Sequence, residues 1–211
     1  MVQIVQARDI SLEELKQQFH LQLASDQGFF DEWKGEPISL SPFEVQQLGR
    51  IQRNYAHLSE LKRFSEEAVK MVVLSPLLDL ADFYQAPFGL VTEESVELVS
   101  EDEGVVVKGK IDVLVVKQGL WILVVESKST QFDVLSALPQ ALAYMLDSPN
   151  KKRSVYGLLV NGREFVFVKL QHKPAPLYAR SFALSVERDR DLAQVLSMLK
   201  SIRHRLASGD A

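Results

Sequence analysis

The chain has 211 residues, of which 46% are hydrophobic and 25% charged, so it can form one domain with a substantial core but hardly two. It contains no cysteine, which excludes disulfides and thiolate metal sites and fits a reducing cytoplasm. No stretch approaches about 18 uncharged apolar residues, so we expect a soluble, cytoplasmic protein that does not enter a membrane. A net charge of −4 gives no overall attraction to nucleic acid.

Start signals for two helices stand out near the N-terminus. After a short edge strand expected at Val2–Val5, Ser11 and Glu14 form a capping-box pattern, in which each residue caps the backbone of the other. Ser41 and Glu44 repeat this pattern, with a proline at the first helical position. The sequence therefore predicts one helix after Ser11 and another after Ser41.

The helix that begins after Ser41 has a long apolar pattern. Hydrophobic residues recur at three- and four-residue intervals to about Leu74, and Pro76 is expected to stop the helix there. A break near Ser59 or Ser65 would divide this pattern into two helices. The sequence leaves both alternatives open.

The stretch Val105–Lys128 is the most informative part of the chain. Ile111–Val116 and Trp121–Val125 are apolar and mostly β-branched or aromatic, and Lys117-Gln118-Gly119 separates them. This pattern predicts two buried strands joined by a short hairpin. The alternating stretch Ser95–Val99 predicts a half-buried strand before them.

Charged residues lie at the ends of these apolar runs. If Val116 pairs with Ile122, the antiparallel register places Asp112 opposite Glu126, with Cβ atoms about 4.5–5.5 Å apart. Lys128 follows Glu126 by two residues and would point to the same face of the sheet. The sequence therefore predicts that two carboxylates and one amine converge.

Two carboxylates this close repel each other unless a cation lies between them. Oxygen ligands from Asp112 and Glu126, completed by the Ser127 carbonyl and water, suit Mg²⁺. Lys128 could then orient the attacking water or neutralise charge that develops on a phosphate. In the alternative interpretation, Lys128 only forms a salt bridge with one of the carboxylates.

Asp112, a hairpin and Glu126-Ser127-Lys128 together resemble the active-site signature of the PD-(D/E)XK nuclease superfamily, which has the restriction-endonuclease-like fold. The residue before Asp112 is Ile111, where the motif has proline. Downstream, the segment Gln140-Ala-Leu-Ala-Tyr144 is similar to the QxxxY element of the RecB-like branch.

Upstream, Glu67 and the segment Ser75-Pro76-Leu77-Leu78 are similar to the acidic helix and PLL turn in the N-terminal nuclease domain of type I restriction enzyme R subunits. The resemblance covers about Ser65–Tyr144. It implies an α/β fold with a restriction-endonuclease-like core, in which a mixed central β-sheet is flanked by helices. Within a single nuclease-like domain, we expect an N-terminal helical extension over 1–40, the core over 41–170, and a C-terminal strand and helix over 171–211.

The resemblance implies a metal-dependent deoxyribonuclease that hydrolyses DNA phosphodiester bonds with Mg²⁺, for which Mn²⁺ can substitute. Asp112, Glu126 and the Ser127 backbone carbonyl would bind the metal, with Glu67 as an additional ligand, and Lys128 would act in catalysis. The alternative for Glu67 is a solvated face charge that pairs with Lys70 or Arg63.

By the same resemblance, Gln140 would reach the active-site lysine or a DNA phosphate, and Tyr144 would support it. The two residues are four apart and therefore share one helix face. The helix that carries them is expected from Phe132 or Ser136 to Asp147. In the alternative, Tyr144 only packs on the sheet.

Further elements follow in the C-terminal third. Two strands, Ser154–Val160 and Glu164–Leu170, flank Asn161-Gly162, which is typical of a type I′ hairpin turn. A last strand is expected within Tyr178–Leu184, and a closing helix over Asp189–Leu206.

The sequence contains no phosphate-loop pattern, so it lacks the ATP-driven motor of R subunits, and a separate motor or specificity subunit is an expected partner beside DNA. Nucleases of this fold often act as homodimers. The alternative function is a non-catalytic DNA-binding or assembly module that retains the nuclease fold. The basic turn Lys151-Lys152-Arg153 could contact phosphates, or it could be a solvated charge cluster.

Overall fold

A long strand, β4 (Val105–Lys117), is second from one edge of a mixed sheet that joins nine strands within the described part of the chain. The computed structural model describes residues 3–26, 28–34, 38–61, 65–100, 104–117, 120–127 and 131–208. Strand β3 (Phe88–Val99) runs antiparallel along almost all of β4. The opposite side of β4 is shared by two strands in series, β1 (Gln3–Gln6) and β5 (Leu120–Ser127).

The remaining strands extend the sheet beyond β5. Strand β6 is parallel to β5 and forms an antiparallel hairpin with β7, whose other side pairs with β8 and β9. Strand β2 pairs with β8 at the far edge. The bounds of these strands are Gln22–Leu23 (β2), Val155–Val160 (β6), Glu164–Gln171 (β7), Leu177–Arg180 (β8) and Leu184–Ser185 (β9).

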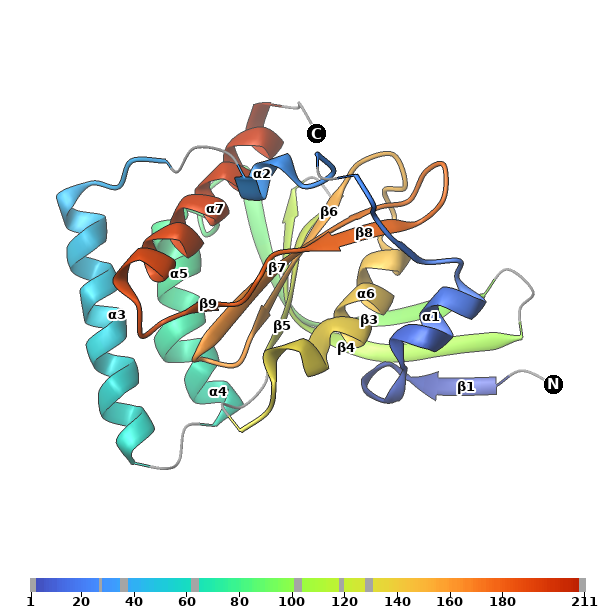
Figure 1. Ribbon diagram of the computed structural model, residues 1–211, viewed down its shortest axis with the longest axis horizontal. Coiled ribbons are helices and arrows are strands. Elements are labelled where there is room, and N and C mark those ends of the chain that lie inside the picture. The colour runs from blue at the N-terminus through green and yellow to red at the C-terminus, as the bar shows by residue number, and fades with distance from the viewer. Residues whose placement is uncertain are drawn as a thin grey trace.

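Helices cover both faces of the sheet, so the described chain is a mixed α/β protein (Figure 1). Helices α3, α5 and α7 lie on one face, and α1 and α6 lie on the other. The helices are α1 (Leu12–Gln18), α2 (Asp31–Lys34), α3 (Pro42–Glu60), α4 (Glu66–Val69), α5 (Ser75–Leu80), α6 (Leu138–Asp147) and α7 (Asp189–Ser208). A π-helical turn, Lys70–Leu74, connects α4 to α5, and a 3-10 turn, Val134–Ala137, precedes α6.

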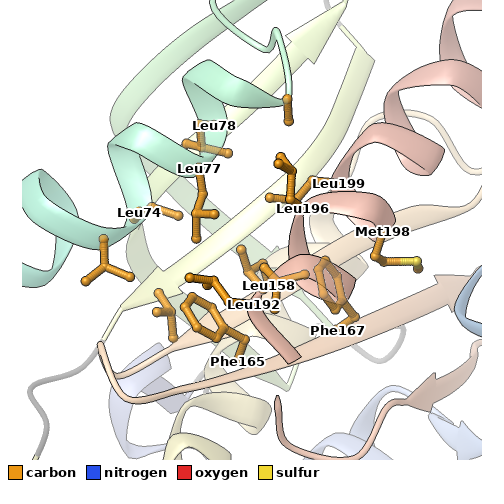
Figure 2. Close-up of a cluster of buried hydrophobic side chains, with 14 of the residues drawn as sticks. Leu74, Leu77, Leu78, Leu158, Phe165, Phe167, Leu192, Leu196, Met198 and Leu199 are labelled. Carbon is orange, nitrogen blue, oxygen red and sulfur yellow. The ribbon is translucent and has the colours of Figure 1, made fainter. Parts of the chain in front are cut away.

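Each face of the sheet has its own hydrophobic core. On the first face, leucines of α5 and α7 meet Leu158, Phe165 and Phe167 of the β6–β7 hairpin (Figure 2). On the second face, α6 packs against β4, β6 and β7. Alternate residues of β6 and β7 enter the two cores, as the period of two along a strand requires. No helix in the described ranges is long and apolar enough to cross a membrane.

Several local signals in the sequence are confirmed. Both capping boxes are present, with the Ser11 and Ser41 hydroxyls accepting from the N–H groups of Glu14 and Glu44. The long apolar pattern divides at Ser65, whose hydroxyl caps α4. The expected edge strand, the central hairpin strands, the β6–β7 pair and the closing helix all form.

Three expectations about the path of the chain are wrong. Pro76 does not end the helical segment, because it lies in the first turn of α5, where a missing N–H is tolerated. Strand β3 starts at Phe88 rather than near Ser95, because its first half pairs with the distal half of β4. The turn at Asn161-Gly162 is not type I′, which needs two positive φ angles, because φ is positive only at Gly162.

The N-terminal region, the C-terminal strand and the start of α6 also differ in detail from the expectations. The N-terminal region, expected as a helical extension after its edge strand, also contains the short strand β2. The C-terminal strand is divided into β8 and β9. The segment before α6 is capped by Asp133 rather than Ser136, and Pro139 lies in the tolerated first turn of α6.

Replacing Leu77 with alanine tests the first core. Leu77 is fully buried, so Leu77→Ala should lower the free energy of unfolding by about 2–5 kcal/mol through lost burial and a residual cavity. Met71→Ala, six residues earlier in the same helical segment and 74% exposed, should change it by less than about 0.5 kcal/mol. Urea denaturation of the two variants and wild type measures both values, and equal losses would contradict the packing of α5.

A second prediction concerns acid stability. The Glu44 carboxylate bonds to the Lys200 ammonium and to Ser41, and these contacts outweigh burial and lower its pKa from 4.5 to about 2. A depressed pKa stabilises the fold above pH 4.5, and this stability is lost as pH falls toward 2. The stability difference between wild type and Glu44→Gln should therefore be largest near neutral pH and shrink between these limits. A difference independent of pH would contradict this ion pair between α3 and α7.

Candidate functional site

A pocket of about 520 Å³ lies between the α4–α5 segment and strands β3 and β4. Two of the predicted site residues, Glu67 and Asp112, line it together. Its wall also contains Lys70, Met71, Leu74, Ser75, Leu78, Tyr84, Leu90, Thr92, Glu93 and Val113. The pocket therefore combines apolar side chains with three carboxylates, those of Glu67, Glu93 and Asp112, and one ammonium group.

The helical wall of the pocket is shaped by a π-helical turn. Ser65 starts α4, and the chain widens at Lys70–Leu74, where the Ser75 N–H bonds to the Lys70 carbonyl five residues earlier. Such wide turns within helices occur frequently at functional sites. The widened turn directly precedes Pro76, whose ring would crowd a carbonyl in a regular helix. Glu67 and Lys70 are thereby presented toward the sheet.

The strand wall of the pocket has an irregularity at Asp112. Ile111 and Leu114 both pack into the second core, although residues three apart on a regular strand face opposite sides. Asp112 and Val113, which lie between them, both border the pocket. On the neighbouring strand, Glu93 has a positive φ of 56°, which is uncommon for a non-glycine residue. The break in alternation turns Asp112 toward α4.

The Asp112 carboxylate accepts a hydrogen bond from the Lys70 ammonium at 3.0 Å. Lys70 also contacts Glu66 at 3.2 Å. The alternative from the sequence paired Lys70 with Glu67, but its partner within the helix is Glu66. The side chains of Lys70 and Asp112 are 26% and 18% exposed. Burial opposes charge on Lys70, but the hydrogen bonds and charges of Asp112 and Glu66 outweigh it and raise the pKa of Lys70.

The second predicted carboxylate belongs to the strand next to Asp112. Val113 pairs with Val125, and one further step along this register leads from Asp112 to Glu126. The predicted pairing of Val116 with Ile122 is wrong, because a register shift at this point places Trp121 opposite Val116. The shift lies at the hairpin end of the strands, so it leaves the register at Val113 as expected.

On the side of β5 away from β4, the backbone around Glu126 pairs with β6. Glu126 pairs with Leu159 of β6, and Ser127 pairs with Val160. The side chains of Glu126 and Ser127, and the whole of Lys128, lie outside the described residues. The convergence of Glu126 and Lys128 on Asp112 therefore stays a prediction.

Gln140 and Tyr144 line a separate pocket of about 260 Å³ beside the middle of β4. The Gln140 amide donates to the Tyr144 hydroxyl at 2.9 Å. This pocket also contains Gln6, Ala7, Arg8, Lys108, Gly109 and Lys110. Along this side of β4, β1 pairs as far as Lys108 and β5 pairs from Val113. The pocket lies beside β4 between these two pairing partners. The structure thus brings Gln140 and Tyr144 to β4 a few residues from Asp112, but not into the same pocket.

Lys70 is the site residue that sequence reasoning missed as a partner of Asp112. The two residues are 42 positions apart, and no local pattern links them. The signal that could have indicated a role was the glutamate four residues before Lys70 on the same helix. Among the side chains that the structure describes, no three histidine, aspartate or glutamate residues form a group that could hold a metal ion.

The close approach of Tyr144 to β4 requires glycine at position 109. A Cβ atom there would lie 2.6 Å from the Tyr144 hydroxyl and 2.7 Å from the Ala7 Cβ. Gly109→Ala should therefore lower the free energy of unfolding by roughly 1–3 kcal/mol. Gly89→Ala, on β3, is the matched control, because its nearest contact would be 3.4 Å. Chemical denaturation that finds both variants equally stable would contradict this packing.

The described residues of the site offer carboxylate oxygens and one ammonium group. Asp112 and Glu67 offer oxygen donors in one pocket, and the Glu126 backbone lies on the adjoining strand. Oxygen donors suit a hard cation such as Mg²⁺, and a nearby ammonium suits a phosphate. Comparison with known protein families and with curated proteins found no match to either.

Proposed function

We propose that this protein is a Mg²⁺-dependent DNA nuclease of the PD-(D/E)XK type. The observation that carries the proposal is the placement of Asp112, which faces Glu67 across one pocket and lies on the strand next to Glu126. Three of the four charged residues of the motif, Glu67, Asp112 and Glu126, thus belong to neighbouring elements. The fourth, Lys128, is the residue that follows the end of β5.

The donor set fits the implied metal. Asp112, Glu126 and the Ser127 carbonyl would bind Mg²⁺, and Glu67 would bind it directly or through water. Bound there, Mg²⁺ supplies Lewis acidity, which polarises a phosphate and lowers the pKa of a coordinated water. Lys128 would position the attacking water or stabilise charge on the phosphate in the transition state. Gln140 would bind a neighbouring phosphate, with its amide held by Tyr144.

Lys70 adds a role that the motif does not include. Its ammonium contributes a charge partner to the partly buried Asp112 carboxylate. A divalent cation and Lys70 would compete for the same oxygen. We therefore assign Lys70 as a positioning residue that keeps the pocket formed before the metal binds.

The arrangement of elements supports the nuclease assignment as well. The helical segment with Glu67 precedes the sheet, the two hairpin strands with Asp112 and Glu126 follow, and α6 with Gln140 comes next. This order, and a mixed sheet with helices on both faces, are what the resemblance to the R-subunit nuclease domain implies. A DNA-bound homodimer or a complex with a separate motor subunit would be compatible with it.

Two observations favour a second candidate function. The Lys70 to Asp112 ion pair satisfies the carboxylate without any metal, and the net charge of the chain is −4. The ion pair would suit a non-catalytic DNA-binding or assembly module that retains the fold, and the acidic net charge would suit an assembly role more than DNA binding. Such a module should bind no Mn²⁺ in a manner that depends on Asp112.

Replacement of Asp112 tests the proposed function. In a plasmid-cleavage assay with Mg²⁺, Asp112→Asn should lower the cleavage rate by more than about 100-fold. Removing a residue that only hydrogen-bonds to a metal ligand typically costs about 10–100-fold in activity, and removing the ligand itself should cost more. Asp79→Asn, an exposed carboxylate on α5, should cleave at the wild-type rate. Circular dichroism checks that both variants fold. Metal-dependent cleavage that persists in folded Asp112→Asn would refute the assignment.

A further inference from the structure

A small basic pocket of about 200 Å³ lies at the other end of the molecule's central sheet. It forms between the loop that follows α6 and the loop that follows β7. Strand β6 begins at Val155, beside this pocket, and ends at Val160, which pairs with Ser127 near the candidate nuclease site. The lining residues are Lys151, Lys152, Arg153, Ser154, Gln171, His172 and Lys173.

The pocket concentrates positive charge in a chain that is acidic overall. Four of its seven lining residues are cationic, whereas the net charge of the chain is −4. Within the described part of the chain, no carboxylate forms an ion pair with any of the four, although Asp147 acts electrostatically on Lys151. Several lysines elsewhere in the described chain form ion pairs, as Lys108 does with Glu97 at 3.0 Å. Lys152, Arg153 and Lys173 therefore have no carboxylate ion-pair partner among the described residues, and their positive charge favours an anion.

Hydrogen bonds hold the two loops in place. The Lys151 ammonium donates to the Leu146 carbonyl at the end of α6. The Gln171 amide donates to the Ser154 hydroxyl at 3.2 Å, which links the two loops directly. The backbone N–H of Lys152 donates to the Asn150 side chain. The loops are thus ordered before a ligand binds, which lowers the entropic cost of binding.

His172 provides an independent observation. Its Nε2 lies 3.3 Å from the Leu146 carbonyl, so Nε2 carries the proton and Nδ1 is an acceptor. Within the described structure, Nδ1 is buried and has no hydrogen-bond partner. Burial, together with the charge of Lys151, lowers the pKa of His172 to about 4, so the ring is neutral. A buried polar atom without a partner is rare, and the P–OH group of a singly protonated phosphate monoester or of pyrophosphate could donate to it, whereas a phosphodiester of DNA carries no such proton.

We propose that this pocket binds a phosphate group. Its volume is below the range of about 300–1,000 Å³ usual for drug-sized ligands, which suits a single small oxyanion. Arginine and lysine side chains bind phosphate oxygens through charge-assisted hydrogen bonds, and Lys152, Arg153 and Lys173 are placed to donate them. The phosphate belongs either to a nucleic acid or to a small phosphorylated compound. The proposal does not depend on the metal site.

Binding measurements with two probes test the proposal and identify the source of the phosphate. Inorganic pyrophosphate is titrated by calorimetry, and a labelled DNA duplex by fluorescence anisotropy, both with EDTA so that cleavage plays no part. The pocket variant is Lys152→Ala with Lys173→Ala, two exposed side chains whose loss should leave the fold intact. Lys16→Ala with Arg190→Ala changes the net charge equally at exposed positions outside the pocket.

We expect the pocket variant to bind pyrophosphate at least about tenfold more weakly than wild type, while the control variant changes less than about twofold. Weaker binding of pyrophosphate supports a site for a small phosphorylated compound. Weaker binding of DNA alone supports a site for a nucleic-acid phosphate. No binding of either probe by wild type, or equal effects of the two variants, would overturn the proposal, and neither result would bear on metal-dependent cleavage.

Discussion

The Asp112 carboxylate needs a cation, and the candidate site is built around this requirement. An ionised carboxylate that is mostly removed from water is unfavourable unless it is paired. Lys70 provides the charge from a helix that is 42 residues away in sequence, and Glu66 holds Lys70 from the other side. Lys70 is the first residue of the π-helical turn. A divalent cation in the same place would meet the same requirement with more ligands.

Strand β4 explains why the functional candidates cluster. Along one side it pairs with β1 at its start and with β5 at its end, and among the described residues no strand pairs with that side over the short stretch between Lys108 and Val113. Asp112 lies at one end of this stretch. Gly109, at the other end, receives Tyr144 of α6. Along this side of β4, the Tyr144 side chain of α6, the Asp112 carboxylate and the basic residues Lys108 and Lys110 therefore lie within a few residues of one another.

The parts of the structure that depend on neighbouring residues were predictable from sequence. Ser41 and Glu44 contact each other within one turn, and the β-branched runs around the central hairpin specify their own faces. The features that were missed depend on distant segments. Strand β3 extends to Phe88 because β4 offers it a partner, and Trp121 moves opposite Val116 through a bulge that no residue pattern marks. The ion pair between Lys70 and Asp112 also depends on distant segments, because nothing in the sequence around either residue indicates its partner.

The direct test of the central claim is a crystal structure of the protein soaked with Mn²⁺, with anomalous diffraction locating the metal. The proposed nuclease site predicts an anomalous peak bonded to oxygens of Asp112 and Glu126, with the Lys70 ammonium displaced from Asp112. A structure in which Lys70 remains bonded to Asp112, with no metal between the two carboxylates at saturating Mn²⁺, would contradict it.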